Sequence, residues 1–147
     1  MSEPKKPHLP IGYWLKQADE LLTRRINEAQ RANGLNRTDW QILNVLQEAG
    51  SATDEQLATS LQPFASAAAL REAVAALSQR GLVAGHGSAD DGYTLTMQGE
   101  RIYETALASQ KEVRQRSMKG ISEVDYATTV RVLQLIVENL RDESTVQ

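Results

Sequence analysis

Few side chains in this 147-residue chain have the types and spacing that catalysis requires. It holds two histidines far apart, His8 and His86, and it has no cysteine, no glycine-rich phosphate loop and no His/acid metal-binding spacing. No nucleophile with a neighbouring base can be named, and disulfides and thiolate metal sites are excluded. We therefore predict a protein that is not an enzyme and that carries no metal and no cofactor.

Residues suited to nucleic-acid binding gather instead near one predicted helix. Arg71 lies one turn into a helix that begins at Ser66 and continues with Ala67, Ala68 and Ala69. An arginine at such a position can bind a guanine edge or a phosphate, and alanine can pack against a thymine methyl group. The alternative for Arg71 is a solvated salt bridge, for example within its own helix.

Four other residues are candidate DNA contacts, each with a second interpretation. Ser66 and Thr53 precede helices, where a hydroxyl can cap the helix and also donate to a phosphate. Arg37 is a candidate phosphate contact or an exposed surface arginine. His86 is a candidate cationic contact or a plain turn residue.

The segment from Gly50 to Thr96 would position these residues. Thr53 with Gln56 three residues later is a capping-box pattern that starts a short helix. A second helix follows, with Leu70, Val74 and Leu77 at helical spacing, and then two β-prone segments surround a Gly/Ser/Asp turn. Helix, turn, helix and hairpin in this order predict a winged helix-turn-helix, whose second helix enters a DNA major groove.

Four more helices are predicted around this unit. One runs from Ile11 to near Gly34, one follows a cap at Thr38, one starts at Thr96 and breaks at Gly120, and the last is capped by Ser122. The last helix is apolar around most of its circumference, more than a monomer's surface helix requires. We therefore predict a homodimer with two-fold symmetry.

The predicted fold class is mainly α (α+β), a winged helix-turn-helix with long terminal helices. Its 41% hydrophobic and 24% charged residues are typical of a globular protein, and the length suits one domain, 1–147. Within it we predict a DNA-binding lobe at 35–97 and a helical dimerisation lobe at 8–34 and 98–143. No apolar run has membrane-spanning length, so a cytoplasmic location is expected.

The net charge of −3 is unevenly distributed. Residues 1–33 carry +2, residues 34–99 carry −4 and residues 100–147 carry −1. The middle segment has three arginines, Arg37, Arg71 and Arg80, against seven acidic residues. Because phosphate neutralisation supplies much of the affinity for DNA, this counts against tight non-specific binding, although a few well-placed arginines matter more than the sum.

Three stretches resemble the MarR (multiple antibiotic resistance regulator) family of winged-helix transcription regulators. They are D-E-Q-L-A-T-S-L, L-R-E-A-V-A-A-L-S-Q-R-G-L-V and Y-T-L-T-M-Q-G-E, at positions 54–61, 70–83 and 93–100. The resemblance implies a dimer that binds a pseudo-palindromic operator and is often released by a small aromatic or anionic effector. Tyr13, Trp14, Trp40 and Tyr103 lie on helices that the family brings together near its effector site; core packing is their other interpretation.

The sequence departs from the family in the wing and in the recognition helix. The wing reads G-H-G-S-A-D-D-G-Y, without the arginine that family members usually carry there. The recognition helix opens with alanines rather than polar or basic residues, and Gln62-Pro63-Phe64 looks like a small insertion before it. The leading hypothesis is a ligand-responsive repressor. The alternative is a winged-helix protein-interaction module with weak or lost DNA binding.

Overall fold

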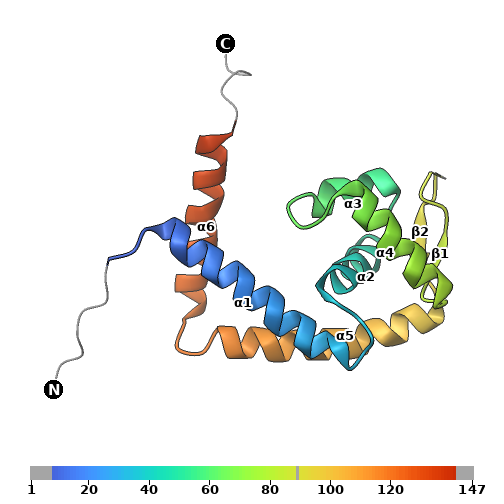
Figure 1. The fold of residues 1–147 in the computed structure, drawn as a ribbon, viewed down its shortest axis with the longest axis horizontal. Coiled ribbons are helices and arrows are strands. Elements are labelled where there is room, and N and C mark those ends of the chain that lie inside the picture. Colours follow the sequence, from blue (N-terminus) through green and yellow to red (C-terminus); the bar gives the residue numbers. More distant parts are fainter. Residues whose placement is uncertain (1–7, 89, 142–147) are drawn as a thin grey trace, which may run out of the picture. The chain divides into compact units, whose positions relative to one another are not determined.

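The computed structural model describes residues 8–88 and 90–141 and contains, in that part, six helices and one two-stranded sheet (Figure 1). One compact unit ends at Val113 and a second begins at Arg114. Within the described residues, no helix combines the length and hydropathy that a membrane crossing requires. The elements are α1 (Ile11–Arg31), α2 (Arg37–Ala49), α3 (Asp54–Leu61), α4 (Ala67–Gln79), β1 (Val83–Gly85), β2 (Tyr93–Leu95), α5 (Met97–Ser117) and α6 (Glu123–Leu140).

Local capping pairs start three of these helices where the sequence predicts. The Thr53 hydroxyl accepts from the Gln56 N–H at 3.1 Å, and the Gln56 side chain accepts from the Thr53 N–H at 2.9 Å. The Ser66 hydroxyl accepts from the Ala69 N–H at 3.1 Å, and Ser122 caps α6 in the same manner. Each cap satisfies an amide that the helix itself leaves without a partner.

The predicted cap of α2 is wrong. Asn36, not Thr38, is the N-cap residue, and Thr38 lies inside the first turn. The Asn36 side chain accepts from the Asp39 N–H at 2.9 Å, while the Asp39 carboxylate accepts from the Asn36 N–H at 3.1 Å. This reciprocal box satisfies two amides at once, so it fixes the helix start.

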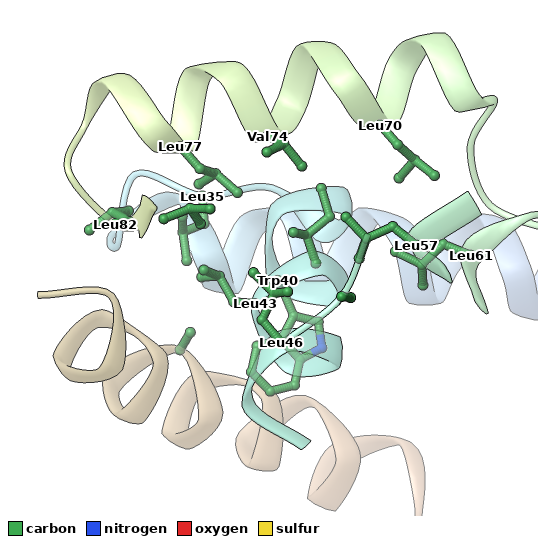
Figure 2. Packing of buried hydrophobic residues seen from close by; sticks show 14 residues of the cluster. Leu35, Trp40, Leu43, Leu46, Leu57, Leu61, Leu70, Val74, Leu77 and Leu82 are labelled. Carbon is green, nitrogen blue, oxygen red and sulfur yellow. The ribbon is translucent and has the colours of Figure 1, made fainter. Parts of the chain in front are cut away.

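The hydrophobic core lies between α2, α3 and α4. Figure 2 shows Leu70, Val74 and Leu77 pointing from α4 toward α2, and each is at most 2% exposed. Leu57 and Leu61 of α3 complete the cluster beside them. Each such side chain contributes about 1.5–3 kcal/mol on burial, so this face of α4 is fixed and only the opposite face is available for binding.

One antiparallel pairing forms the hairpin, and one extra bridge joins it to the segment before α3. In β1 and β2, Val83 pairs with Leu95 and Gly85 with Tyr93. Tyr93 also pairs with Ala52, just before α3, through N–H to carbonyl distances of 3.1 and 2.7 Å. The wing is thereby joined to the start of the helix-turn-helix.

Helix α1 is held to α5 by a fully buried polar residue. Gln30 is 0% exposed, and its side-chain amide donates to the Ala106 carbonyl at 2.8 Å. Asn33 donates to the Gln30 side-chain oxygen at 3.0 Å. Both ends of the Gln30 amide have hydrogen-bond partners, so its burial carries little free-energy penalty. The bond to the Ala106 carbonyl fixes how α1 packs on α5.

Helix α6 buries none of its residues in the single chain. Large apolar side chains are exposed along it, including Val124, Leu135 and Leu140. Near its start, Glu123 lies 3.6 Å from the Arg114 guanidinium, which also faces the Tyr126 ring at 5.0 Å. The apolar character that the sequence predicts for this helix is therefore on its surface.

Candidate nucleic-acid interface

The exposed face of α4 is the candidate binding surface. Ala67, Ala68 and Ala69 in its first turn are exposed, as is Arg71 in the next turn. Ser66 is exposed as well, with its hydroxyl occupied as the acceptor of the cap. Small side chains around the N-terminus of a helix allow a DNA backbone to approach it closely. The free backbone N–H groups of the first turn favour a negative group such as a phosphate.

Arg71 forms no ion pair within residues 8–88 and 90–141. It lies near a polar pair that joins α3 to the wing, in which the Tyr93 hydroxyl donates to the Asp54 carboxylate at 2.8 Å. Burial raises the pKa of Tyr93, as do the hydrogen bond and charge of Asp54, while the positive charge of Arg71 opposes the shift. The fold thus brings Asp54 and Tyr93 into contact, and the charge of Arg71 acts on this pair.

The wing loop packs closely against the start of α3. The Asp54 N–H donates to the Gly87 carbonyl at 3.0 Å, and a Cβ at Gly87 would lie 2.1 Å from the Asp54 carboxyl carbon. His86, Asp90 and Asp91 are exposed on this loop. The described part of the wing therefore presents a histidine and two carboxylates to solvent.

Arg37 is directed toward α1 rather than into open solvent. Its Nη1 lies 3.3 Å from the Asp19 carboxylate and donates to the Thr23 hydroxyl. Its guanidinium carbon lies 4.9 Å from the centre of the Phe64 ring. A cavity of 270 Å³ adjoins this group and is lined by Asp19, Thr23, Asn27, Asn36, Arg37, Thr38, Gln41, Pro63 and Phe64.

The four aromatic residues predicted near an effector site form two separate pairs. Trp40 and Tyr103 are stacked, with ring centres 5.5 Å apart, and the Tyr103 hydroxyl donates to Asn44 at 3.0 Å. Burial raises the pKa of Tyr103, as does the charge of Glu48. Tyr13 and Trp14 meet edge to face at 5.0 Å. None of the four lines the 270 Å³ cavity.

The structure thus groups most of the predicted DNA contacts and separates others. Ser66, the three alanines and Arg71 share the N-terminal half of α4, and Thr53 caps the neighbouring α3. Sequence reasoning missed Asp54 and Tyr93 as a pair, because they are 39 residues apart. It also missed Phe64 as a partner of Arg37, although a lone phenylalanine in a predicted insertion was a usable indication.

Comparison with known proteins agrees on the type of fold. No protein-family model matches the chain. The transcriptional repressor IacR of Pseudomonas putida is 25% identical over 94% of this chain and 83% of its own length. Among solved structures, CouR of Rhodococcus jostii RHA1, bound to p-coumaroyl-CoA, has a TM-score of 0.79 at 20% identity, covering 90% of this chain and 95% of its own.

A second solved structure is a complex with DNA. The Mycobacterium tuberculosis MarR-family protein Rv2887 has a TM-score of 0.70 at 20% identity, covering 87% of this chain and 98% of its own. The order of elements, the hairpin after the second short helix and these likenesses agree with one another. The chain has the winged helix-turn-helix fold of the MarR family of transcription regulators.

Proposed function

We propose that the chain is a homodimeric DNA-binding repressor that inserts α4 into the major groove of a pseudo-palindromic operator. One observation carries the proposal. The buried face of α4 is fixed by Leu70, Val74 and Leu77, while its N-terminal turn and Arg71 are exposed and without an ion pair in the described chain. The DNA complex of Rv2887 supports the same use of the fold. Such a protein would act in the cytoplasm, with the chromosome.

A titration against DNA tests the proposal. Fluorescence anisotropy with a labelled duplex from upstream of its own gene should show saturable binding. The affinity should fall linearly with salt on a double-logarithmic plot, with a slope of about −0.9 for each neutralised phosphate. A scrambled duplex of the same length is the control. Absence of binding at low salt would refute the proposed function.

The homodimer is supported by apolar surface on two helices. Ile11, Trp14 and Leu15 are exposed on α1, and Leu135 and Leu140 on α6. Sedimentation equilibrium should give twice the mass of the chain. Leu135→Asp should shift the protein toward the monomer, whereas Arg101→Asp, at an exposed polar position of α5, should not.

We include a small aromatic or anionic effector in the proposal. CouR has been solved with p-coumaroyl-CoA, and Rv2887 also with salicylic acid. The predicted site, Tyr13, Trp14, Trp40 and Tyr103, contains both tryptophans of the chain. Titration with salicylate or p-coumarate should therefore change tryptophan emission, and Trp14→Phe and Trp40→Phe variants would show which pair responds. Unchanged emission with unchanged operator binding would count against this site.

The charge of the winged segment favours a second candidate function. Residues 34–99 carry −4, and the wing exposes Asp90 and Asp91. A winged-helix module of this charge could bind a basic protein surface instead of DNA. This second function predicts weak or no operator binding together with salt-sensitive association with a basic protein. The anisotropy titration, repeated with a labelled basic protein in place of the duplex, therefore separates the two functions.

A further inference from the structure

We infer that two arginines, Arg37 and Arg80, clamp the recognition helix α4 to α1 and to the turn that follows it, one at each end of α4. Both would be positioning residues that hold the helix rather than DNA contacts. The consequence for operator binding rests on the proposed function. The clamp itself does not, because all of its contacts lie within the unit that ends at Val113.

The first contact is at the N-terminal end of α4. Phe64 comes two residues before the cap Ser66, and it is 50% exposed although its neighbours Leu61 and Leu70 are buried. Its ring lies 4.9 Å from the guanidinium carbon of Arg37. The loop before α4 is therefore fastened from outside the core, by a cation against an aromatic face.

Arg37 is in turn held by one side of α1. Its Nη1 contacts Asp19 and Thr23, and its backbone N–H donates to the Asn27 side chain at 2.7 Å. These three residues are spaced by four along α1, so they form one stripe facing the start of α2. The Arg37 side chain is only 18% exposed. A guanidinium held in this way cannot reach a phosphate without leaving both α1 and Phe64.

The second contact is at the C-terminal end of α4. Arg80 is the C-cap residue of that helix, and its guanidinium donates to the Gly34 carbonyl at 2.8 Å and the Asn33 carbonyl at 3.4 Å. Both carbonyls belong to the turn that follows Arg31, the last residue of α1. A guanidinium fork suits two neighbouring carbonyl groups.

Together the two contacts restrain α4 against both translation and tilt relative to α1. Hydrophobic contacts fix the buried face of α4 but are non-directional and tolerate small sliding motions, whereas the arginine contacts at both ends are directional. A displacement of α1 would therefore carry α4 with it. In a dimer built on α1, this sets the separation of the two recognition helices.

Amide hydrogen exchange on the DNA-free protein tests the clamp directly. Arg37→Met and Phe64→Leu should both accelerate exchange at Phe64, Ala65 and Ala69, which are hydrogen-bonded in this loop and first turn. Arg80→Met should accelerate exchange at the opposite end of α4. Arg101→Met, which removes an exposed arginine from α5, is the charge-matched control. Wild-type exchange around α4 in all three clamp variants would overturn the inference.

Operator titrations then distinguish positioning from phosphate contact. Arg37→Met and Phe64→Leu should each weaken binding by roughly 2- to 30-fold, the range of one cation–π contact, and the double variant should be little worse than either. The salt slope should match that of Arg101→Met. The clamp would be refuted if Arg37→Met lowered the salt slope by about one per protomer while Phe64→Leu bound the operator with wild-type affinity. Arg37 would then be a phosphate contact.

Two controls keep the results interpretable. Circular dichroism should show native helicity in each variant. Arg37→Lys keeps the charge that Asp19 and Phe64 contact but not the planar fork, so exchange should be slower than in Arg37→Met. Exchange as fast as in Arg37→Met would contradict the cation–π part of the clamp. If the wild-type protein binds no operator, the proposed function fails while the exchange experiment still decides on the clamp.

Discussion

Replacing Gly92 by alanine should separate the wing from the helix-turn-helix. Gly92 has φ of +66°, and an added Cβ would lie 2.3 Å from the Ala52 carbonyl oxygen and 2.8 Å from the Thr53 nitrogen. Both are backbone atoms, so no side-chain rotation relieves the overlap. Accommodating the methyl group requires the Ala52–Tyr93 bridge to open.

The size of the effect follows from what is lost. The bridge consists of two backbone hydrogen bonds, of 3.1 and 2.7 Å. Each contributes about 1 kcal/mol to the free energy of unfolding. A left-handed alanine costs about 1 kcal/mol more. Gly92→Ala should therefore lower the free energy of unfolding by about 3 kcal/mol.

Gly50→Ala is the matched control. Gly50 has φ of +84°, yet nothing lies within 4 Å of an added Cβ. Only the conformational cost, about 1 kcal/mol, should appear in this variant. Urea unfolding of both variants would measure the difference, and amide exchange at Tyr93 should rise only in Gly92→Ala. An equal loss of stability in the two would refute the role assigned to the bridge.

Three further predictions concern the binding face of α4 and the polar pair that joins α3 to the wing. If Arg71 contacts a base, Arg71→Met should weaken operator binding by about 1–3 kcal/mol and remove discrimination at one base pair. If Arg71 binds a phosphate, the same variant should lower the salt slope by about 0.9 per protomer. Unchanged affinity and an unchanged slope would exclude both roles. Ser66→Ala should lower the free energy of unfolding by about 1 kcal/mol, measured by thermal melting. Ser66→Asp should restore the cap and the stability, but its negative charge should weaken DNA binding in the anisotropy titration. Tyr93→Phe should cost about 1–2 kcal/mol near neutral pH through the lost bond to Asp54. Because the folded pKa of Tyr93 is raised, wild-type stability should fall as pH rises from about 10 through that pKa, and unfolding curves should show a smaller fall in Tyr93→Phe.

The features that sequence predicts well are those set by near neighbours. Thr53 and Gln56 are three residues apart, and Ser66 caps an amide three residues on. The apolar spacing of Leu70 and Leu77 likewise identifies the buried face of α4. These interactions require no knowledge of the rest of the fold, which is why the order of helices and strands was predictable.

The missed features depend on residues distant in sequence. Gln30 resembles a surface residue, but its amide is buried against a carbonyl 76 residues away. The role of Arg37 depends on how α1 packs, which no local pattern determines. The candidate effector residues likewise separate into two pairs because packing, not helix spacing, decides which rings meet.

The acidic residues behind the −4 charge of the winged segment differ in how they are exposed and hydrogen-bonded. Asp54 accepts one hydrogen bond from the Tyr93 hydroxyl, and Asp39 is half-buried in the α2 capping box. Burial raises the pKa of Asp39, against the opposing effects of the Asn36 hydrogen bond and the Arg80 charge. Asp90 and Asp91, by contrast, are exposed on the wing.

If the wing faces DNA, those two carboxylates repel the phosphates directly. A charge pair in water interacts by about 1 kcal/mol at 4 Å and by about half as much at 8 Å, so Asp90→Asn with Asp91→Asn should strengthen operator binding roughly 5- to 30-fold per protomer at low salt. The gain should shrink as salt is added, because screening removes it. Glu104→Gln, at an exposed position of α5, should leave the affinity nearly unchanged. Equal affinity for the wing variant and the wild type would place the wing away from the duplex, and operator binding would then rest on α4 alone.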